Sequence, residues 1–359
     1  MSIKGLLAAS IFFLPSLVWG YGDAEALLAD TLIPPLESYR GTLEVSAGSD
    51  GRSKTVVVMS SPEGGVRREI VDRFGLPIVT IVSDGETEWI YDHARAIVWK
   101  GEPADADLKL LDPDEEMELL LENYTVRDAG VETVAERKCR AIEILTGQES
   151  PRLLRRLCVD EESGIVLQRQ TFDAKGNESG SVRFLRLEMP ASIPQRRFKF
   201  QPPADVSVRA NRLLPDYMAL EEAAAATAMT PRVPRWVPNG FVFESVNLLA
   251  YRGTTVLHYR YSDGIDALSV FQAPRGTHLR FPGERPRRLT FDAGDGDLAL
   301  WSGGKTLTWS AGDRFVVIGR LSVESLRRIA DSIPTKDDAK SDVSGGFTEI
   351  DGFGEEALP

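Results

Sequence analysis

Residues Trp236–Gln272 read WVPNGFVFESVNLLAYRGTTVLHYRYSDGIDALSVFQ, and the rest of the chain is interpreted around them. The stretch holds three runs that are typical of β-strands, at Phe241–Ala250, Thr255–Tyr261 and Ala267–Gln272. A polar residue followed by glycine precedes or separates the runs, and such pairs supply the positive φ angles that tight hairpin turns need. The stretch therefore predicts a meander of antiparallel strands, and it carries no catalytic signature.

The whole chain has 359 residues, which suits two domains, and its net charge is −12. Contacts with nucleic-acid phosphates need clustered Lys and Arg, so this charge argues against nucleic acid as a partner. Three histidines are present, and the sequence holds no Ser/His/Asp arrangement, HExxH motif, phosphate-binding loop or dinucleotide fingerprint. We therefore expect a protein that is not an enzyme, has no metal site and needs no cofactor.

The N-terminus predicts a signal peptide over residues 1–20, cleaved after about Gly20. Lys4 precedes an apolar run from Gly5 to Val18. This run is shorter than the roughly 20 residues of a membrane-spanning helix, and acidic sequence follows it. A membrane anchor that is never cleaved is the alternative. No other stretch is long and apolar enough to cross a bilayer, so we expect an exported protein in a bacterial periplasm.

From Tyr39 to Trp99, short strand-like runs alternate with turn-forming residues such as SPEGG and SDGE. Apolar residues fall on both parities of these runs, which predicts a sheet that is covered on both faces. Two predicted helices, Ala24–Ile33 and the acidic Asp114–Tyr124, are available to cover it. A strongly curved sheet wrapped around these helices fits the pattern and would leave an apolar concavity. A full core without a cavity is the alternative.

The most suitable side chains to line such a concavity, and to bind an apolar ligand there, are Trp89, Tyr91, Ile97 and Trp99. Acidic residues crowd the start of the second predicted helix, at Asp112, Asp114, Glu115 and Glu116. Carboxylates are favourable at a helix N-terminus, so we interpret this run as a helix cap rather than a metal site.

The two cysteines, Cys139 and Cys158, lie in the strand-like runs CRAIEIL and RLLRRLCVD with turn-like residues between them. An exported chain with two cysteines favours a disulfide, here across neighbouring strands of a hairpin. Two free thiols are the alternative.

Changes in composition divide the chain. We predict a first domain at 21–204, a helical linker at 205–234, a second domain at 235–334 and a disordered acidic tail at 335–359. The predicted fold is mixed and mainly β (α+β): a curved antiparallel sheet, or half-barrel, that wraps helices, followed by a smaller α+β domain.

A basic loop follows the opening meander of the second domain. It contains Arg275, Arg280, Arg285, Arg287 and Arg288 against a single Glu284. Arginine suits a bidentate grip on phosphate or carboxylate, so the loop is a candidate patch for an anionic ligand or partner. A solvated loop balanced by nearby acids is the alternative.

The second domain resembles that of the MucB/RseB family, which regulates the sigma-E (AlgU-type) pathway, through WVPNGF, YSDGIDALSVFQ and the late IADSI. The strand-rich first domain, which opens at SYRGTLEV, resembles LolA/LppX-like lipoprotein carriers. The resemblance implies a LolA-like first domain and a periplasmic, non-enzymatic sensor of envelope stress.

Such a sensor binds the periplasmic domain of an inner-membrane anti-sigma factor and protects it from proteolysis. Lipid, lipopolysaccharide or lipoprotein ligands release it. A LolA-type carrier that only transports lipid or lipoprotein is the alternative. The sequence leaves the oligomeric state open, a homo-oligomer included.

Overall fold

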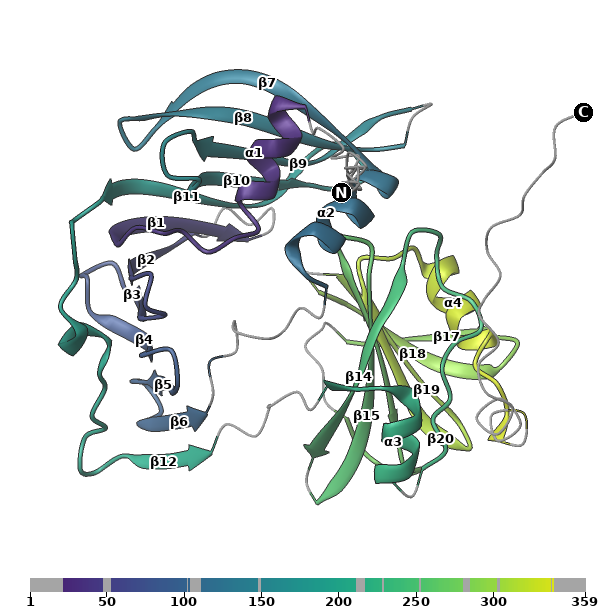
Figure 1. Ribbon diagram of the computed structural model, residues 1–359. Coiled ribbons are helices and arrows are strands. Elements are labelled where there is room, and N and C mark those ends of the chain that lie inside the picture. Colours follow the sequence, from purple (N-terminus) through teal and green to yellow (C-terminus); the bar gives the residue numbers. More distant parts are fainter. Residues whose placement is uncertain are drawn as a thin grey trace, which may run out of the picture.

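The computed structural model describes residues 22–47, 53–101, 103, 111–147, 150–210, 217–227, 229–251, 253–279, 285–301, 304–336 and 338. These residues form one sheet of twelve strands and one of eight (Figure 1). The predicted fold class, mainly β with a curved sheet around helices and a smaller α+β domain, is confirmed. The predicted signal peptide and nearly all of the predicted tail lie outside the described residues.

The first sheet has the strand order β12-β6-β5-β4-β3-β2-β1-β11-β10-β9-β8-β7. All neighbours are antiparallel except β12, which runs parallel to β6. The sequence analysis did not predict β7 or β12. The strands are β1 (Tyr39–Ala47), β2 (Ser53–Ser60), β3 (Val66–Val71), β4 (Pro77–Ser83), β5 (Glu88–Asp92), β6 (Ile97–Gly101), β7 (Tyr124–Val134), β8 (Arg137–Thr146), β9 (Arg152–Asp160), β10 (Val166–Phe172), β11 (Glu178–Glu188) and β12 (Ser207–Ala210). A short 3-10 helix, η1 (Gln195–Phe198), follows β11.

Two helices, α1 (Asp23–Asp30) and α2 (Pro113–Asn123), cover one face of this sheet (Figure 1). The side chain of Asp112 accepts the N–H of Glu115 at 2.9 Å, so the interpretation of the acidic run as a helix cap is confirmed. Beneath the helices lies an apolar cluster of Leu28, Met117, Leu120, Ile142, Ile144, Leu157 and Val159.

The opposite face of β8 and β9 carries the predicted disulfide between Cys139 and Cys158. The two residues are diagonal neighbours, since Cys158 lies opposite Ala141 in the ladder. Both sulfurs are buried in a second apolar cluster that includes residues of β1, β2, β7, β10 and β11. The disulfide therefore lies on the face of β8 and β9 that the two helices leave uncovered.

The second sheet has the order β13-β14-β15-β16-β20-β19-β18-β17. Both α3 (Leu220–Ala226) and α4 (Val323–Asp331) add residues to the same core, whose largest members are Trp309, Tyr259 and Phe315. Ser322 caps α4, because its Oγ accepts the N–H of Ser325 at 2.9 Å. The strands are β13 (Tyr217–Met218), β14 (Val242–Tyr251), β15 (Thr254–Ser262), β16 (Ala267–Ala273), β17 (Arg287–Phe291), β18 (Gly294–Trp301), β19 (Gly304–Ala311) and β20 (Asp313–Gly319).

The first half of the predicted linker contains one strand of each sheet, β12 beside β6 and β13 beside β14. Its last part is held by buried polar groups. The N–H of Arg232 donates to Gln272 Oε1 at 2.9 Å, and its guanidinium donates to the carbonyls of Ala311 and Pro334, each at 2.6 Å. The predicted domain boundaries stay a prediction.

Removal of the disulfide tests its contribution to the fold. Cysteines separated by 19 residues close a loop that stabilises the folded state by about 3 kcal/mol. We expect the double variant Cys139→Ser/Cys158→Ser to lose about this much free energy of unfolding in urea titrations. The wild-type value should fall toward that of the variant when reductant is added, whereas the variant should not respond to it. Equal stability of the two proteins without reductant would contradict the prediction.

Candidate functional site

The end of α2 meets two turns of the second sheet, and both turns belong to the stretch that opened the sequence analysis. Asn123 Nδ2 donates to the carbonyl of Leu119, to that of Gly240 at 3.0 Å and to that of Asp263 at 3.2 Å. Gly240 belongs to WVPNGF and Asp263 to YSDGID. One amide therefore joins the first domain to both motifs.

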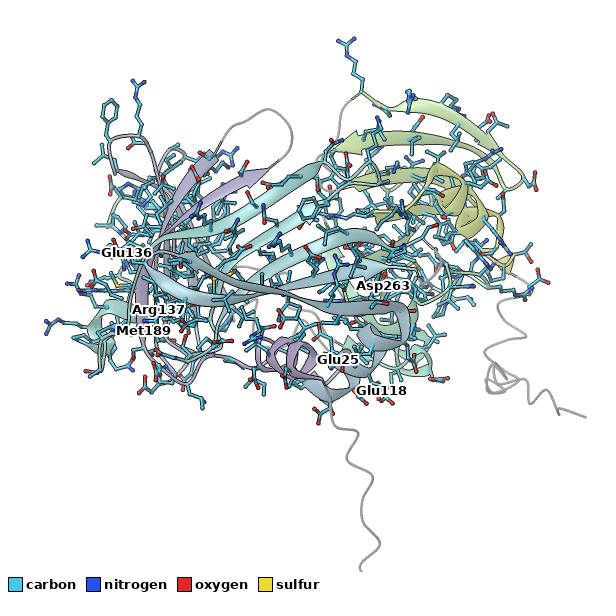
Figure 2. All side chains as sticks on the ribbon, turned by 90° about the horizontal axis from the view of Figure 1, so that it is seen from above. Glu25, Glu118, Glu136, Arg137, Met189 and Asp263 are labelled. Atoms are coloured by element: carbon cyan, nitrogen blue, oxygen red, sulfur yellow. A yellow bond between two sulfur atoms is a disulfide. The ribbon has the colours of Figure 1, made fainter. Side chains whose placement is uncertain are left out.

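Asp263 is the centre of this junction between the sheets, and Figure 2 shows it beside the helix that carries Glu118. The hydroxyl of Tyr124 donates to Asp263 Oδ2 at 2.6 Å. The backbone N–H groups of Ile265 and Asp266 donate to Oδ1 at 2.9 and 2.6 Å. Burial raises the pKa of Asp263 above its usual range in spite of these donors, and burial also raises the pKa of Tyr124.

The next two residues of the turn complete the junction. Ile265 packs against the cluster between α1, α2, β8 and β9. Arg155 of β9 donates to the carbonyl of Ile265 at 2.8 Å and pairs with Asp266 at 3.2 Å. The turn between β15 and β16 thus places an apolar side chain in the core of the first domain and flanks it with hydrogen bonds.

Glycine is required in this turn for two reasons. Gly264 has a φ of +88°, and a Cβ there would lie 2.8 Å from the backbone of Leu120 in α2. Gly276 has the same φ of +88° but nothing within 4 Å of its Cβ position. Of these two glycines, Gly264 alone combines the backbone requirement with the close approach of another element.

A cavity of about 470 Å³ opens beside the junction, between the ends of β8–β11 and the strands β18 and β19. Its wall combines apolar, basic and acidic side chains. The side chains of these three kinds are Leu153, Leu154, Phe172, Leu300, Trp301, Arg152, Lys305, Arg320, Asp173 and Asp266. This volume lies within the range of about 300–1,000 Å³ that is typical of small-molecule sites.

The sequence analysis predicted the turn between β15 and β16 as a hairpin turn, but it named no residue of the junction or of the cavity as a site residue. One signal was available: Ile265 is an apolar side chain between two aspartates of a turn, where a solvated turn would be polar throughout.

The predicted lining of the first domain is divided between two faces of the sheet. Lys100 lies opposite Trp89 in the ladder between β5 and β6, and its ammonium lies 5.1 Å above the Trp89 ring. Residues that lie opposite each other share a face, and alternate residues of a strand do too. Trp89 and Tyr91 are therefore on one face, and Ile97 and Trp99 are on the other. The correction is that these four side chains do not form a single lining.

One of these pairs is also covered by the chain itself. The Phe200 ring lies 5.8 Å from that of Trp89 and 6.0 Å from that of Tyr91. A ligand role for either pair stays a prediction.

The predicted basic patch is only partly described, because Arg280 lies outside the described residues. Arg275, Arg285 and Arg287 are exposed, and none forms an ion pair within the described part of the chain. Arg288 lies 3.3 Å from Asp295 and 3.5 Å from Asp297, so acids of β18 balance it. A binding role for the patch stays a prediction.

Two of the three histidines, His93 and His258, have structural partners. His258 shares a hydrogen bond of 2.9 Å with Ser269 and stacks on Phe271, and burial lowers its pKa to about 4. His93 shares one of 2.9 Å with Thr80. Within the described ranges no group of three or more His, Cys, Asp or Glu side chains is placed to hold a metal. No helix there is long and apolar enough to cross a membrane.

Comparison with known proteins identifies the first domain. Residues 37–202 match the family model "MucB/RseB N-terminal domain". The chain carries a MucB/RseB domain. The resemblance in the sequence is thereby confirmed for this part, and the MucB/RseB domain contains β1–β11 with α2.

Solved structures extend the similarity of fold to the second sheet. The crystal structure of MucB in complex with MucA(peri) has a TM-score of 0.54, with 20% identity, over 88% of this chain and 99% of that one. The Pseudomonas aeruginosa MucA/MucB complex has a TM-score of 0.55 at the same identity and coverage. At this identity the likeness concerns the fold alone.

A curated relative covers less of the chain. The outer-membrane lipoprotein carrier protein of Dechloromonas aromatica (strain RCB) is 26% identical over 213 residues. These residues are 96% of the carrier but 57% of this chain. The carrier is thus too short to match both domains.

The junction can be tested with a matched pair of glycine variants. We expect Gly276→Ala to lower the free energy of unfolding by about 1–2 kcal/mol, the usual effect of a side chain at positive φ. Gly264→Ala should cost roughly 1–3 kcal/mol more, because its Cβ meets α2. Urea titration measures both, and small-angle scattering should show a larger radius for Gly264→Ala alone. Equal effects would show that the β15–β16 turn does not bear on α2.

The buried Asp263 predicts a pH dependence of stability. Its pKa is raised in the folded protein, so the folded state holds the proton more tightly than the unfolded chain. The contribution of Asp263 should be greatest below the ordinary Asp pKa of 3.8 and should fall as the pH rises through the raised value. Asp263→Asn cannot titrate. We therefore expect the difference in unfolding free energy, wild type minus variant, to decline over this window and then level off. Parallel curves in urea titrations from pH 3 to 8 would oppose this assignment.

Proposed function

We propose that the protein is a non-enzymatic periplasmic sensor of envelope stress. In this proposal it binds the periplasmic domain of a membrane-anchored anti-sigma factor, protects that domain from proteolysis, and releases it when a lipid or lipoprotein ligand binds.

The observation that carries the proposal is the MucB/RseB domain at 37–202, joined to a second sheet in the arrangement of MucB. The similar structures include MucB bound to MucA(peri). The described residues also offer no catalytic constellation: His258 is buried and neutral, and no metal-binding group is present among them.

The second candidate function is a lipoprotein carrier, which the similarity to the Dechloromonas aromatica protein favours. The match covers 96% of the carrier but 57% of this chain, so the carrier is too short to contain both domains. In this chain the second sheet is docked through Asn123, Tyr124 and Arg155. A protein that only carries lipoprotein does not need this junction. A protein that binds its partner with two domains does need it, because the junction fixes the position of one domain relative to the other.

Protection from proteolysis tests the proposal directly. The periplasmic domain of the anti-sigma factor from the same bacterium is incubated with its site-one protease, with and without one equivalent of the mature protein. We expect digestion to slow by about tenfold or more with wild type and with Gly276→Ala. Gly264→Ala should protect less, because its domains no longer dock in the same way.

An unchanged rate of digestion with wild type would overturn the proposal. If the tagged protein then captured lipoprotein or free lipid from the envelope, but no anti-sigma factor, the carrier function would replace it.

A further inference from the structure

The tip of the hairpin between β3 and β4 exposes a cluster of apolar side chains. Phe74, Leu76 and Ile78 follow one another closely in the chain, and they are 73%, 64% and 43% exposed. Scattered apolar residues are ordinary on a protein surface, whereas a cluster of them marks a site of interaction. Figure 1 shows β3 and β4 in the part of the first sheet that is remote from the second sheet, so the docking of the two sheets does not cover this tip.

The side chain of Asp72 fixes the backbone of the tip. Its Oδ1 accepts the N–H groups of Phe74 and Leu76 at 2.8 and 2.9 Å. The carbonyl of Asp72 accepts the N–H of Gly75 at 3.0 Å, and its own N–H donates to the carbonyl of Leu76 at 2.9 Å. Gly75 has a φ of +80°, which suits glycine. The tip therefore presents its side chains on a backbone that is already ordered.

The turn between β10 and β11 has the same architecture but carries different side chains. Asp173 Oδ1 accepts the N–H groups of Lys175 and Asn177 at 2.8 and 2.9 Å. The carbonyl of Asp173 accepts the N–H of Gly176 at 3.0 Å, and Gly176 has a φ of +82°. In the β3–β4 turn the two positions that hold Lys and Asn here are occupied by phenylalanine and leucine. Since one backbone geometry accepts both pairs, the turn itself does not require apolar residues.

The β3–β4 tip presents no free backbone donor from Phe74 to Pro77. The N–H groups of Phe74, Gly75 and Leu76 have acceptors inside the turn, and Pro77 has no N–H. An N–H without an acceptor is costly in an apolar medium, because no water is present to bind it. This tip can therefore leave water without losing hydrogen bonds, which is the condition for entry into hydrocarbon.

The cation next to this cluster is compatible with a lipid surface. The guanidinium of Arg73 lies 4.7 Å above the Phe74 ring. A long cationic side chain can bury its stem and keep its charge at the level of the head groups, and aromatic rings favour the same level. Among the described residues nothing lies within 4 Å of the Cβ position of Gly75, so the tip projects into the solvent. A protein partner would need a pocket of matching shape, whereas a bilayer takes up a projecting apolar tip without one.

We propose that the β3–β4 tip docks on the surface of a phospholipid bilayer, with Phe74 and Leu76 in the apolar layer and Arg73 among the head groups. No lipid molecule leaves the bilayer in this contact. The net charge of −12 opposes attraction to an anionic membrane, so the apolar side chains supply the binding energy and no anionic lipid is needed. The inference goes beyond the proposed function and stands without it.

Flotation of the mature protein with vesicles of neutral phosphatidylcholine tests the tip. The double variant Phe74→Lys/Leu76→Asn copies the side chains of the β10–β11 turn, so its free energy of unfolding should stay at the wild-type value. We expect it to bind the vesicles at least about tenfold more weakly, because two apolar side chains no longer enter the bilayer. Leu185→Asn removes a leucine of β11 that is 53% exposed, and this control should bind as wild type does.

A second pair of variants tests the internal hydrogen bonds of the tip. Asp72→Asn keeps a side-chain oxygen as acceptor and should bind the vesicles at least as tightly as wild type. Asp72→Ala leaves the N–H groups of Phe74 and Leu76 without their acceptor, so it should bind severalfold more weakly although both apolar side chains remain. Equal binding by these two variants would contradict the inference.

Vesicle binding that is equal in wild type and in Phe74→Lys/Leu76→Asn would overturn the inference, as would a lack of binding by wild type. Binding only to vesicles that contain anionic lipid would also overturn it, since charge rather than the apolar tip would then supply the contact. If wild type does not bind vesicles and the tip variant protects less in the protease assay, the tip contacts the partner protein instead. The vesicle assay contains no anti-sigma factor, so vesicle binding without protection would leave this inference in place and overturn the proposed function.

Discussion

A buried carboxylate holds the two halves of this molecule in one orientation. Asp263 is removed from water at the junction, and such a group is tolerated only when donors surround it. Tyr124 supplies one donor from the first domain, and the turn itself supplies two. Ile265 provides the apolar contact. This contact has no fixed direction, so by itself it would allow the two domains to slide past each other. The hydrogen bonds do not allow sliding, because a shift of the domains would take the Tyr124 donor away from the buried carboxylate.

The sequence predicted the local structure well because local structure follows from local chemistry. Turns with Asp-Gly or Asn-Gly marked the meander, the acidic run marked the start of a helix, and two cysteines in facing strands predicted the disulfide. The predictions failed where the structure depends on the pairing of strands, which the sequence pattern does not give. Trp89 and Trp99 read as one lining, but the ladder that sets Trp89 opposite Lys100 sends them to different faces. The hydrophobic pattern of the sequence does not predict the parallel strand β12, since all its residues are exposed.

The residues of the candidate site could not be predicted from the sequence, for the same reason. Tyr124 and Asp263 are separated by 139 residues, and no spacing rule joins them. The two motifs that resemble the MucB/RseB family do contain the glycines and the aspartate of the junction, but a motif does not state what it contacts. The cavity is assembled from both sheets, so its lining comes together only when the domains have docked. Only the structure shows that the turn between β15 and β16, predicted as part of a hairpin, also connects the two sheets.

The strands β12 and β13 lie on either side of residues 211–216, and they limit how far the two sheets can separate once the junction opens. Ala210 is fixed in the first sheet and Tyr217 in the second, with only residues 211–216 between them. A tether this short keeps each half near the other at an effective concentration in the millimolar range. Separation is thus a reversible excursion rather than a dissociation. The junction can therefore re-form within one molecule, independently of the protein concentration.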